Sequence, residues 1–411
     1  MSQGNVDVAV IGGGMITHDQ LLPSLYHLQR RGDVGKITIC ALNAAPLRVL
    51  AESGAFAAAF PGQAFEAMPS LDTPDDQVFP DLYKEAIASL SPRNLVVVAV
   101  PDHLHDPIVR YALEHDQHVL TVKPLVLKYA QAVEIEEMAF QQGLFVGVEY
   151  HKRFDRRSLE ARKQYRAGRL GEFKLGEARL IEPYYYRHSN FQNWFTKENT
   201  DPFTYIGCHY VDLVYFITGL KPTEVCVRGV EGKFPNGNVG YLWSSGTVVW
   251  ENGAILGVIN GLGYPDEGAG TNDQGITMYG EGEDLGTILK HDDQFRGCSY
   301  GYADKDSGAM FRYINPDYFR LVPWQEDGLK PVGYGYESVE ANVLSAISVN
   351  AAGDLAARQA KISEIDARGI VATPANSSIN ELTTEAVRLS ILTDGAPAVI
   401  EYGDAPRARL R

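Results

Sequence analysis

The first 150 residues alternate short apolar runs with segments of helical periodicity, and this alternation constrains the fold more than any other feature of the chain. An apolar run of about four to eight residues is typical of a buried strand, and apolar residues three or four apart are typical of a helix packed on one face. Strands that alternate with helices form parallel sheets with right-handed crossovers. We therefore predict an α/β domain, with one doubly wound parallel sheet, over residues 1–149.

Five apolar runs define the predicted strands of this domain. They are Val6–Ile11, Lys36–Leu42, Leu95–Val100, His118–Val122 and Leu144–Tyr150. In an open parallel sheet, the carboxyl ends of the strands line the ligand crevice. The residues that directly follow these strands are therefore the candidate site residues.

A glycine-rich turn follows the first predicted strand and leads into a helix. It reads Gly12-Gly13-Gly14-Met15-Ile16-Thr17. A bare backbone at the second fingerprint glycine lets a pyrophosphate approach the free N–H groups of a helix N-terminus. A glycine turn after a strand is often only a turn, and Thr17 stands where the G-x-G-x-x-G fingerprint has its third glycine. The predicted dinucleotide contacts here are Gly12, Gly14, Met15 and Ile16.

The end of the second predicted strand leaves the choice between NAD and NADP open. An acidic residue usually binds the adenosine ribose at this point, but the chain reads Leu42-Asn43-Ala44-Ala45. Asn43 can hydrogen-bond a 2′-hydroxyl, and Arg48, the nearest cation, can meet a 2′-phosphate. The predicted cofactor is therefore NAD or NADP, with Asn43 at the ribose.

The third and fourth strands end in further candidate residues. Pro101, His103 and His105 follow Leu95–Val100 and are predicted to border the cofactor. Lys123 follows the strand His118–Val122 and precedes Pro124, which restricts the backbone of the residue before it. We predict that Lys123 is aimed at the ligand crevice and is one of the residues that contact the cofactor there. The alternative is a surface lysine that leaves a strand.

The second half of the chain has a different pattern. Strand-like segments follow one another with short turns, which indicates a mainly antiparallel sheet in an α+β domain. We predict that residues 150–411 form this substrate-binding and oligomerisation domain, and that an exposed sheet face there favours a homodimer or homotetramer. The stretch 283–340 is irregular and gives no assignable elements.

An aromatic stretch in this half suits the faces and hydroxyls of a sugar ring. It runs Pro183-Tyr-Tyr-Tyr-Arg-His-Ser-Asn-Phe-Gln-Asn-Trp194 and mixes aromatic with hydrogen-bonding side chains. Tyr186 and Trp194 are predicted to contact the substrate. Packing of alternate tyrosines in a core or a subunit interface is the alternative.

Composition excludes several classes of function. The formal charge of -15 argues against a nucleic-acid surface. No apolar run approaches the length of a membrane span, and residues 1–7 do not resemble a signal peptide, so we expect a cytoplasmic protein. The four cysteines show no C-x-x-C spacing and no His, Asp and Glu triplet has metal-ligand spacing, so we predict no metal.

Taken together, the motifs resemble the Gfo/Idh/MocA family, named for glucose-fructose oxidoreductase, inositol dehydrogenase and a rhizopine-catabolism protein. The likeness spans nearly the whole chain and is carried by Gly12–Ile16 with His18, Pro101–His105, Lys123-Pro124, Gly147 with Lys152–Asp155, Gly207–Asp212 and Leu392–Gly395. The resemblance implies a Rossmann domain, an open-faced sheet domain, an oligomer, and NAD or NADP used on sugars, inositols and related polyols.

The resemblance also implies the roles of the site residues. His209 would be the base, since histidine suits proton transfer near neutral pH, and Lys123 would hold and polarise the substrate oxygen. The family commonly has Glu before the Lys-Pro pair and Asp four residues before the histidine, whereas this chain has Val122 and Tyr205. Tyr205 can relay a proton or merely pack. The predicted substrate contacts are Lys123, Tyr150, Lys152, Arg153, Tyr186, Trp194, Tyr205 and His209.

Three functions are consistent with these residues. The first is an NAD(P)-dependent dehydrogenase that oxidises a secondary hydroxyl of a sugar, inositol or related cyclic polyol. The second is an enzyme that oxidises a sugar transiently, cleaves or eliminates a substituent, and reduces the sugar again. The third is a non-catalytic regulator that binds a dinucleotide or a sugar. The retained Lys123 and His209 favour an enzyme.

Overall fold

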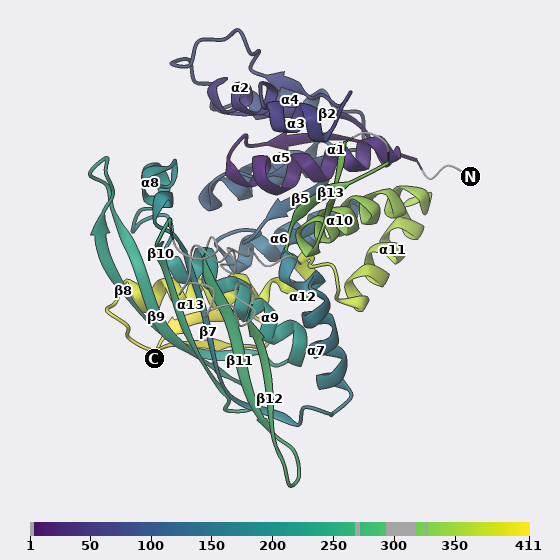
Figure 1. Ribbon diagram of the computed structural model, residues 1–411. Coiled ribbons are helices and arrows are strands. Elements are labelled where there is room, and N and C mark those ends of the chain that lie inside the picture. Colours follow the sequence, from purple (N-terminus) through teal and green to yellow (C-terminus); the bar gives the residue numbers. More distant parts are fainter. Residues whose placement is uncertain (1–3, 268–271, 293–317, 326–327) are drawn as a thin grey trace, which may run out of the picture. The chain divides into compact units, whose positions relative to one another are not determined.

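The computed structural model describes residues 4–267, 272–292, 318–325 and 328–411. The chain divides into two compact units (Figure 1). Unit 1 comprises Met1–Val126, Ala130–Phe154 and Asp317–Ser378, and unit 2 comprises Leu127–Tyr129, Asp155–Pro316 and Ile379–Arg411. Among the described residues, no helix has both the length and the apolar character needed to cross a membrane.

Unit 1 contains the predicted doubly wound sheet. Its six strands lie in the order β3-β2-β1-β4-β5-β6, and every neighbouring pair is parallel. The strands are β1 (Val6–Ile11), β2 (Val34–Cys40), β3 (Glu66–Met68), β4 (Leu95–Val98), β5 (His118–Val122) and β6 (Val146–Glu149). The connecting helices are α1 (Leu22–Arg31), α2 (Ala45–Ala51), α3 (Gly54–Ala59), α4 (Leu82–Ala88), α5 (His105–Glu114) and α6 (Tyr129–Gln142). The α/β prediction is confirmed.

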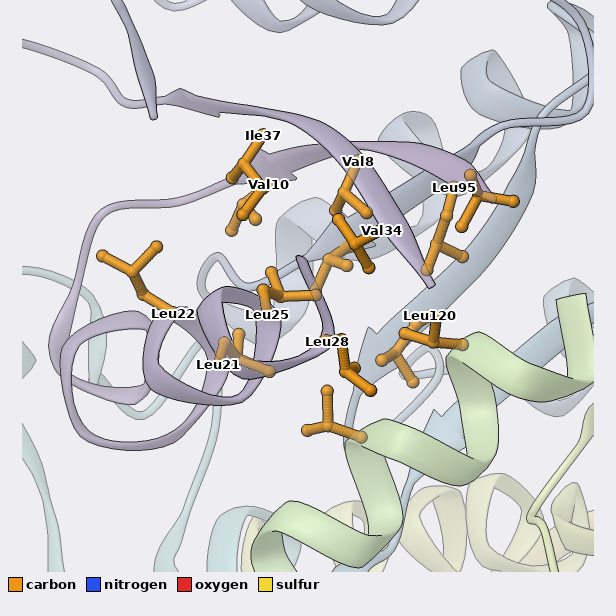
Figure 2. Packing of buried hydrophobic residues seen from close by; sticks show 14 of the residues in the cluster. Val8, Val10, Leu21, Leu22, Leu25, Leu28, Val34, Ile37, Leu95 and Leu120 are labelled. Atoms are coloured by element: carbon orange, nitrogen blue, oxygen red, sulfur yellow. The ribbon is translucent and has the colours of Figure 1, made fainter. Parts of the chain in front are cut away.

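The core of unit 1 lies between this sheet and helix α1. Val8, Val10 and Leu95 point from the sheet toward Leu25 of the helix, and all four side chains are fully buried (Figure 2). Burying an aliphatic side chain of this size stabilises the folded state by roughly 1.5–3 kcal/mol. The apolar runs of the sequence therefore fix the sheet and, with it, the position of each strand end.

Three helices from the C-terminal part of the chain also belong to unit 1. They are α10 (Tyr334–Ala351), α11 (Leu355–Arg368) and α12 (Pro374–Ser377). Val339 and Val343 of α10 join the core cluster of the parallel sheet, and Asn350 lies 2.9 Å from the His118 ring at the start of β5. The sequence-based boundary at residue 149 does not anticipate this return. The buried face of α10 explains it, because that face needs the apolar partner that the sheet provides.

Unit 2 is built on an eight-stranded sheet in the order β12-β11-β7-β10-β9-β8-β15-β16. The strands are β7 (Glu172–Pro183), β8 (Pro222–Lys233), β9 (Val239–Trp250), β10 (Ile255–Tyr264), β11 (Asp273–Glu281), β12 (Gly286–Asp292), β15 (Ala398–Glu401) and β16 (Arg407–Leu410). Within the part of this sheet that the structure describes, only the β7–β10 pair is parallel. The second domain therefore has the mainly antiparallel sheet that the sequence predicts.

One face of this sheet is covered and the other is open. Three helices of unit 2, α7 (Arg156–Arg166), α9 (Cys208–Thr218) and α13 (Ile379–Ile391), lie on the covered side (Figure 1). Leu256 and Val258 of β10 are buried there, whereas Ile255 and Ile259, which alternate with them, are 40% and 53% exposed. Exposed apolar side chains continue across the open face at Leu175, Val230, Tyr279 and Ile288. Much of the irregular stretch 283–340 lies outside the described residues.

Candidate functional site

The glycine turn of unit 1 has the shape that a bound pyrophosphate requires. Gly12 has a φ of 119°, and a Cβ atom there would lie 2.0 Å from the Ala99 carbonyl oxygen, so only glycine fits between β1 and β4. A Cβ at Gly14 would meet no atom within 4 Å, so its backbone faces open space. The residues present thus fit a dinucleotide, whose phosphates can approach the bare Gly14 backbone.

Thr17 stands where the G-x-G-x-x-G fingerprint has its third glycine. Its side chain is fully buried, and its hydroxyl donates a hydrogen bond of 2.7 Å to the Gly12 carbonyl oxygen. Thr17 begins a π-helical turn, Thr17–Leu21, that runs into α1. The hydroxyl therefore ties the helix to the turn, a role that close glycine packing fills in the fingerprint. Met15 and Ile16 are half-buried between these two anchors.

The predicted ribose end, just after β2, contains an arginine that is already paired. Arg48 donates to the carbonyl oxygens of Leu71 and, at 3.0 Å, Thr73, and forms an ion pair with Asp75. The Asn43 side-chain oxygen accepts from the backbone N–H of Ala45 at 3.2 Å. The loop 71–75 thus binds the Arg48 guanidinium and compensates its charge. The bond from Ala45 uses the side-chain oxygen of Asn43 and not its amide nitrogen.

The two histidines that follow β4 have different environments. His105 is fully buried, and its ring nitrogens lie 2.8 Å from the Pro124 carbonyl oxygen and 2.9 Å from that of Val100. These bonds tie the end of β4 to the turn after Lys123. His103 is exposed in the short helix Asp102–Leu104, which Pro101 precedes. His103 is therefore the histidine that a ligand can contact, and His105 holds the turn.

Lys123 lies at the carboxyl end of β5, between the ends of β4 and β6. Its side chain is half-buried, and the Lys123–Pro124 peptide bond is cis. The carboxyl ends of parallel strands commonly contact ligands, and a contact between Lys123 and a ligand stays a prediction.

The three candidates after β6 are more deeply buried than expected of direct substrate contacts. Tyr150, Lys152 and Arg153 are 1%, 3% and 1% exposed. Arg153 donates at 2.9 Å to the side-chain oxygen of Asn376 and at 3.3 Å to its backbone oxygen, so it binds the chain near α12. The neighbouring Glu149 carboxylate accepts from Gln20 at 2.8 Å. Sequence reasoning missed this buried pair, whose members are 129 residues apart.

In unit 2 the structure brings Tyr186, Trp194 and Tyr205 into one aromatic cluster. The Phe191 ring lies 4.9 Å from Tyr186, 5.2 Å from Trp194 and 5.2 Å from Tyr205, measured between ring centroids. Phe195 packs edge-on against Tyr205 at 5.6 Å. The sequence anticipated an aromatic surface here but not that Phe191 would be its centre.

His209 follows Tyr205 by four residues, at the start of α9. Tyr205 lies in a π-helical turn, Phe203–Gly207, that continues directly into α9. His209 is 5% exposed, and Asp212 is buried one helical turn later. The Asp212 carboxylate accepts a hydrogen bond of 2.9 Å from Asn380 of α13. This bond was not anticipated, because no local pattern links residues 168 positions apart.

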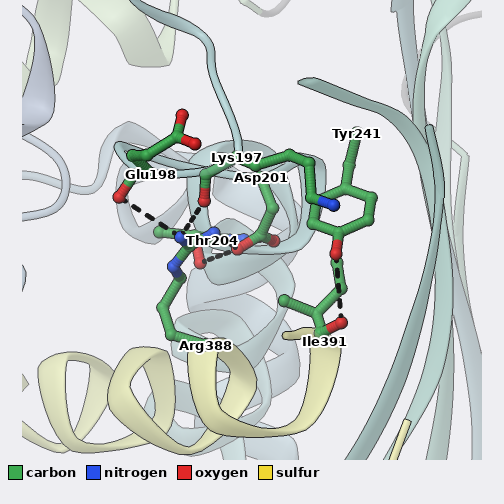
Figure 3. Close-up of polar contacts among 7 residues, drawn as sticks. All are labelled: Lys197, Glu198, Asp201, Thr204, Tyr241, Arg388 and Ile391. Carbon is green, nitrogen blue, oxygen red and sulfur yellow. Dashed lines mark hydrogen bonds and ion pairs between the residues drawn. The ribbon is translucent and has the colours of Figure 1, made fainter. Parts of the chain in front are cut away.

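A buried ion pair lies just before the turn that holds Tyr205. Arg388 of α13 is 3.0 Å from the Asp201 carboxylate, which also accepts from the backbone and hydroxyl of Thr204 at 2.9 and 2.8 Å (Figure 3). Sequence reasoning missed both charged residues. Among the described residues, no group of three or more His, Cys, Asp or Glu side chains is placed to hold a metal ion.

Two family profiles match the chain. The first, the GFO_IDH_MocA oxidoreductase family with an NAD-binding Rossmann fold, matches residues 6–150. The second, the GFO/IDH/MocA C-terminal domain, matches residues 158–281. Together they cover the glycine turn, Lys123 and the Tyr205–His209 segment.

Curated relatives match over part of their length. An uncharacterised oxidoreductase, C115.03, of Schizosaccharomyces pombe is 37% identical over 78 residues, which is 19% of this chain and 21% of the relative. The D-glucoside 3-dehydrogenase of Escherichia coli is 25% identical over 229 residues, 54% of this chain and 57% of that protein. The chain thus spans between about a fifth and somewhat over half of the length of these relatives.

Solved structures match over nearly the whole chain and support the fold. GenD2 from gentamicin A biosynthesis, solved with NAD, has a TM-score of 0.65 at 16% identity and covers 97% of both chains. The scyllo-inositol dehydrogenase of Lactobacillus casei, solved with NAD(H) and scyllo-inositol, has a TM-score of 0.59 at 14% identity, over 96% of this chain and 99% of that one.

Proposed function

The chain belongs to the Gfo/Idh/MocA oxidoreductase family, and from this premise we propose that it is an NAD-dependent dehydrogenase of a sugar, inositol or related cyclic polyol. The observation that carries the proposal is the glycine turn within the region that matches an NAD-binding family profile, with open space at Gly14. The D-glucoside and inositol dehydrogenases among its relatives support the substrate class.

Oxidation of a secondary alcohol requires a hydride acceptor and a base. NAD, if held at the glycine turn, would supply the hydride acceptor. The hydroxyl proton passes to His209, and the Lys123 ammonium binds the substrate oxygen and stabilises the charge that develops on it as the proton leaves. General-base help of this kind accelerates a reaction roughly 10²–10⁴-fold. Tyr205 takes the place of the family's usual carboxylate, as a proton relay beside His209.

The aromatic cluster supplies the surface for the substrate ring. Half-buried Tyr186 and Trp194 pack around Phe191, and aromatic faces suit the C–H faces of a cyclic polyol. Trp194 lies 5.5 Å from the Tyr205 ring, so substrate held against it is near the proposed proton relay. Tyr150, Lys152 and Arg153 are too buried to offer a broad surface to the substrate. We propose that they support the residues that contact it.

The contacts that Arg48 makes with the loop 71–75 favour NAD over NADP as the cofactor. A 2′-phosphate needs a cation with free N–H groups, but Arg48 is bound to two carbonyl oxygens and to the Asp75 carboxylate. Asp75 would also repel a phosphate at this position. The amide nitrogen of Asn43 suits the 2′-hydroxyl that NAD retains.

A homodimer or homotetramer is the assembly that the open sheet face favours. Exposed apolar side chains from β7, β8, β10, β11 and β12 lie on that face, and large exposed apolar patches commonly mark protein interfaces. A face of this kind can pair with its own copy about a two-fold axis. A cytoplasmic location is part of the proposal as well, and cell fractionation would test it.

A ligand panel tests the proposed function. The chain is heated with NAD, NADP and a set of sugars and inositols, and NADH formation is followed with each polyol. A ligand at a hundred times its Kd raises stability by roughly 2.7 kcal/mol. We expect NAD to stabilise the protein more than NADP, and at least one cyclic polyol to yield NADH. Stabilisation by NAD without turnover on any polyol would favour a binding protein instead.

A further inference from the structure

The Tyr205–His209 segment has no regular secondary structure before it, so its position must be set by side chains. Residues 195–202 contain no strand, and Pro202, the N-cap of the π-helical turn that starts at Phe203, makes no side-chain cap hydrogen bond. A helical end without a cap leaves backbone N–H groups unpaired. Asp201 fills this role, and it was not among the residues that the sequence singled out.

Asp201 caps the turn with both oxygens of its carboxylate and with its backbone carbonyl. Its carboxylate accepts from the Thr204 N–H at 2.9 Å and from the Thr204 hydroxyl at 2.8 Å, and its backbone carbonyl accepts from the Tyr205 N–H at 2.9 Å. The residue is fully buried. A carboxylate with no exposed surface and several donors cannot take a proton from a substrate, so its role is to hold the turn.

Arg388 of α13 holds Asp201 in turn. One nitrogen of its guanidinium is 3.0 Å from the Asp201 carboxylate, and another donates to the backbone oxygens of Lys197 and, at 3.3 Å, Glu198 (Figure 3). The arginine side chain is 14% exposed and that of Asp201 is 0% exposed. A buried pair that loses one member leaves an uncompensated charge, which destabilises the fold strongly. The geometry of residues 197–204 is therefore strongly tied to α13.

The same helix also reaches the other side of His209. Asn380, two turns before Arg388 on α13, donates at 2.9 Å to the Asp212 carboxylate, which follows His209 by three residues. A second contact presses the turn against the sheet, because a Cβ at Gly207 would lie 2.6 Å from the side-chain oxygen of Asn260 in β10. His209 thus lies between two α13 anchors, with β10 behind the turn.

We propose that the Arg388–Asp201 ion pair is a positioning device that fixes Tyr205 and His209 for proton transfer. This proposal rests on the proposed dehydrogenase function, because that function requires a proton transfer at Tyr205 and His209. The structural role of the Arg388–Asp201 ion pair, which we call the clamp, does not depend on any reaction. Neither charged residue contacts the substrate. They act through Thr204 and the Tyr205 N–H, and the edge-on rings of Phe191, Trp194 and Phe195 then fix the tyrosine side chain.

Hydrogen exchange of the full-length protein tests the clamp without any substrate. We expect Asp201→Asn and Arg388→Met to speed the exchange of the amides of residues 203–209 at least tenfold. Arg179→Met is the matched control, because it breaks an Arg–Asp pair of similar length, 2.9 Å to Asp273, on the open face of the same unit. The control should leave exchange at 203–209 unchanged. Unchanged exchange in both clamp variants would refute the clamp.

Steady-state kinetics then separate positioning from stability. We expect Asp201→Asn to lower kcat roughly 10- to 100-fold per folded molecule, with the KM for the polyol changed less than threefold and NAD affinity unchanged. If the variant folds poorly, Thr204→Val removes only the hydroxyl bond to Asp201, and we expect a kcat loss of about threefold to tenfold. Loosened amides with an unchanged kcat would overturn the positioning role.

The two proposals fail in different ways. Absence of wild-type turnover on every polyol would refute the proposed dehydrogenase function, and the exchange result alone would then decide the clamp. A fully active wild type whose clamp variants keep full kcat would refute the positioning role and leave the dehydrogenase intact. The double variant Asp201→Asn with Arg388→Met should lose little more activity than either single variant, because both changes break one device.

Discussion

The two units hold their candidate site residues in different ways. The turn at Gly12–Gly14 in unit 1 is fixed by its own backbone, since Gly12 lies against β4 and Thr17 bonds back to it five residues away. The Tyr205–His209 segment in unit 2 is fixed by α13, through contacts that span 168 and 187 residues. Contacts between residues that are close in sequence give a recognisable local pattern, whereas contacts between residues far apart in sequence do not. The turn of unit 1 can therefore be predicted from local sequence, whereas the contacts that position Tyr205 and His209 in unit 2 cannot.

The largest expected effect tests whether each unit supplies a group to the reaction. Lys123→Met removes the ammonium at the end of β5, and His209→Asn removes the proposed base of α9. We expect each change to lower kcat roughly 10²–10⁴-fold, while the Kd for NAD, measured by calorimetry, changes less than threefold. Turnover that survives Lys123→Met would remove unit 1 from the chemistry and leave it as a cofactor holder.

Substitutions at two glycines of one turn test whether the turn of unit 1 is fixed by its own backbone. Gly12→Ala places a Cβ 2.0 Å from the Ala99 oxygen at a φ of 119°, and we expect it to destabilise the protein by about 2–4 kcal/mol. Gly14→Ala meets open space, so stability should change by less than about 0.5 kcal/mol while NAD binding weakens roughly tenfold. Urea unfolding and NAD titration measure both. Equal stability losses would show that the turn is not locally fixed.

Acid sensitivity probes the contact between β5 and α10 inside unit 1. Burial lowers the pKa of His118 from its ordinary value to about 4, and its ring accepts from the Phe145 N–H at 2.9 Å. The unfolded chain then binds more protons than the folded chain between pH 6.5 and 4, so stability falls as the pH falls through that window. We expect a loss on the order of 3 kcal/mol, reduced in His118→Asn and unchanged in exposed His188→Asn.

The preference for NAD over NADP tests whether the ion pair between Arg48 and Asp75 determines cofactor choice in unit 1. Asp75→Ala frees Arg48 from its ion pair, and we expect the ratio of kcat/KM for NADP to that for NAD to rise roughly tenfold, worth about 1.4 kcal/mol. Asp72→Ala, in the same loop but without a bond to Arg48, is the control. A ratio that stays constant in Asp75→Ala would mean that Arg48 does not lie near the ribose.

Self-association tests the open face of unit 2. Ile259→Glu puts a charge in the middle of that face, where Ile259 is 53% exposed, and we expect sedimentation to show at least a severalfold weaker dimer with the fold retained. Val49→Glu changes a similarly exposed residue of α2 in unit 1, 64% exposed, and should leave the assembly intact. A monomeric wild type, or loss of assembly in both variants, would assign the open face another role.

Patterns of local origin were predictable from the sequence. Apolar runs gave the parallel strands, since burial on both faces leaves a continuous signal, and the placement of Lys123 followed from the strand before it. Helix α10 was missed because its buried side faces a sheet whose last strand, β6, ends 185 residues before the helix begins. Asp201, Arg388 and Asn380 were missed for the same reason, since a lone charged residue in a sequence indicates surface until its partner is known.

The most direct test of the proposed chemistry is the ratio of NADH formed to substrate consumed by the wild-type protein with NAD and an active polyol. We expect one NADH for each hydroxyl oxidised, with the ketone as product and no cleavage of the ring substituents. Substrate cleaved with no net NADH would contradict this and show instead that the cofactor is reduced and reoxidised within each turnover.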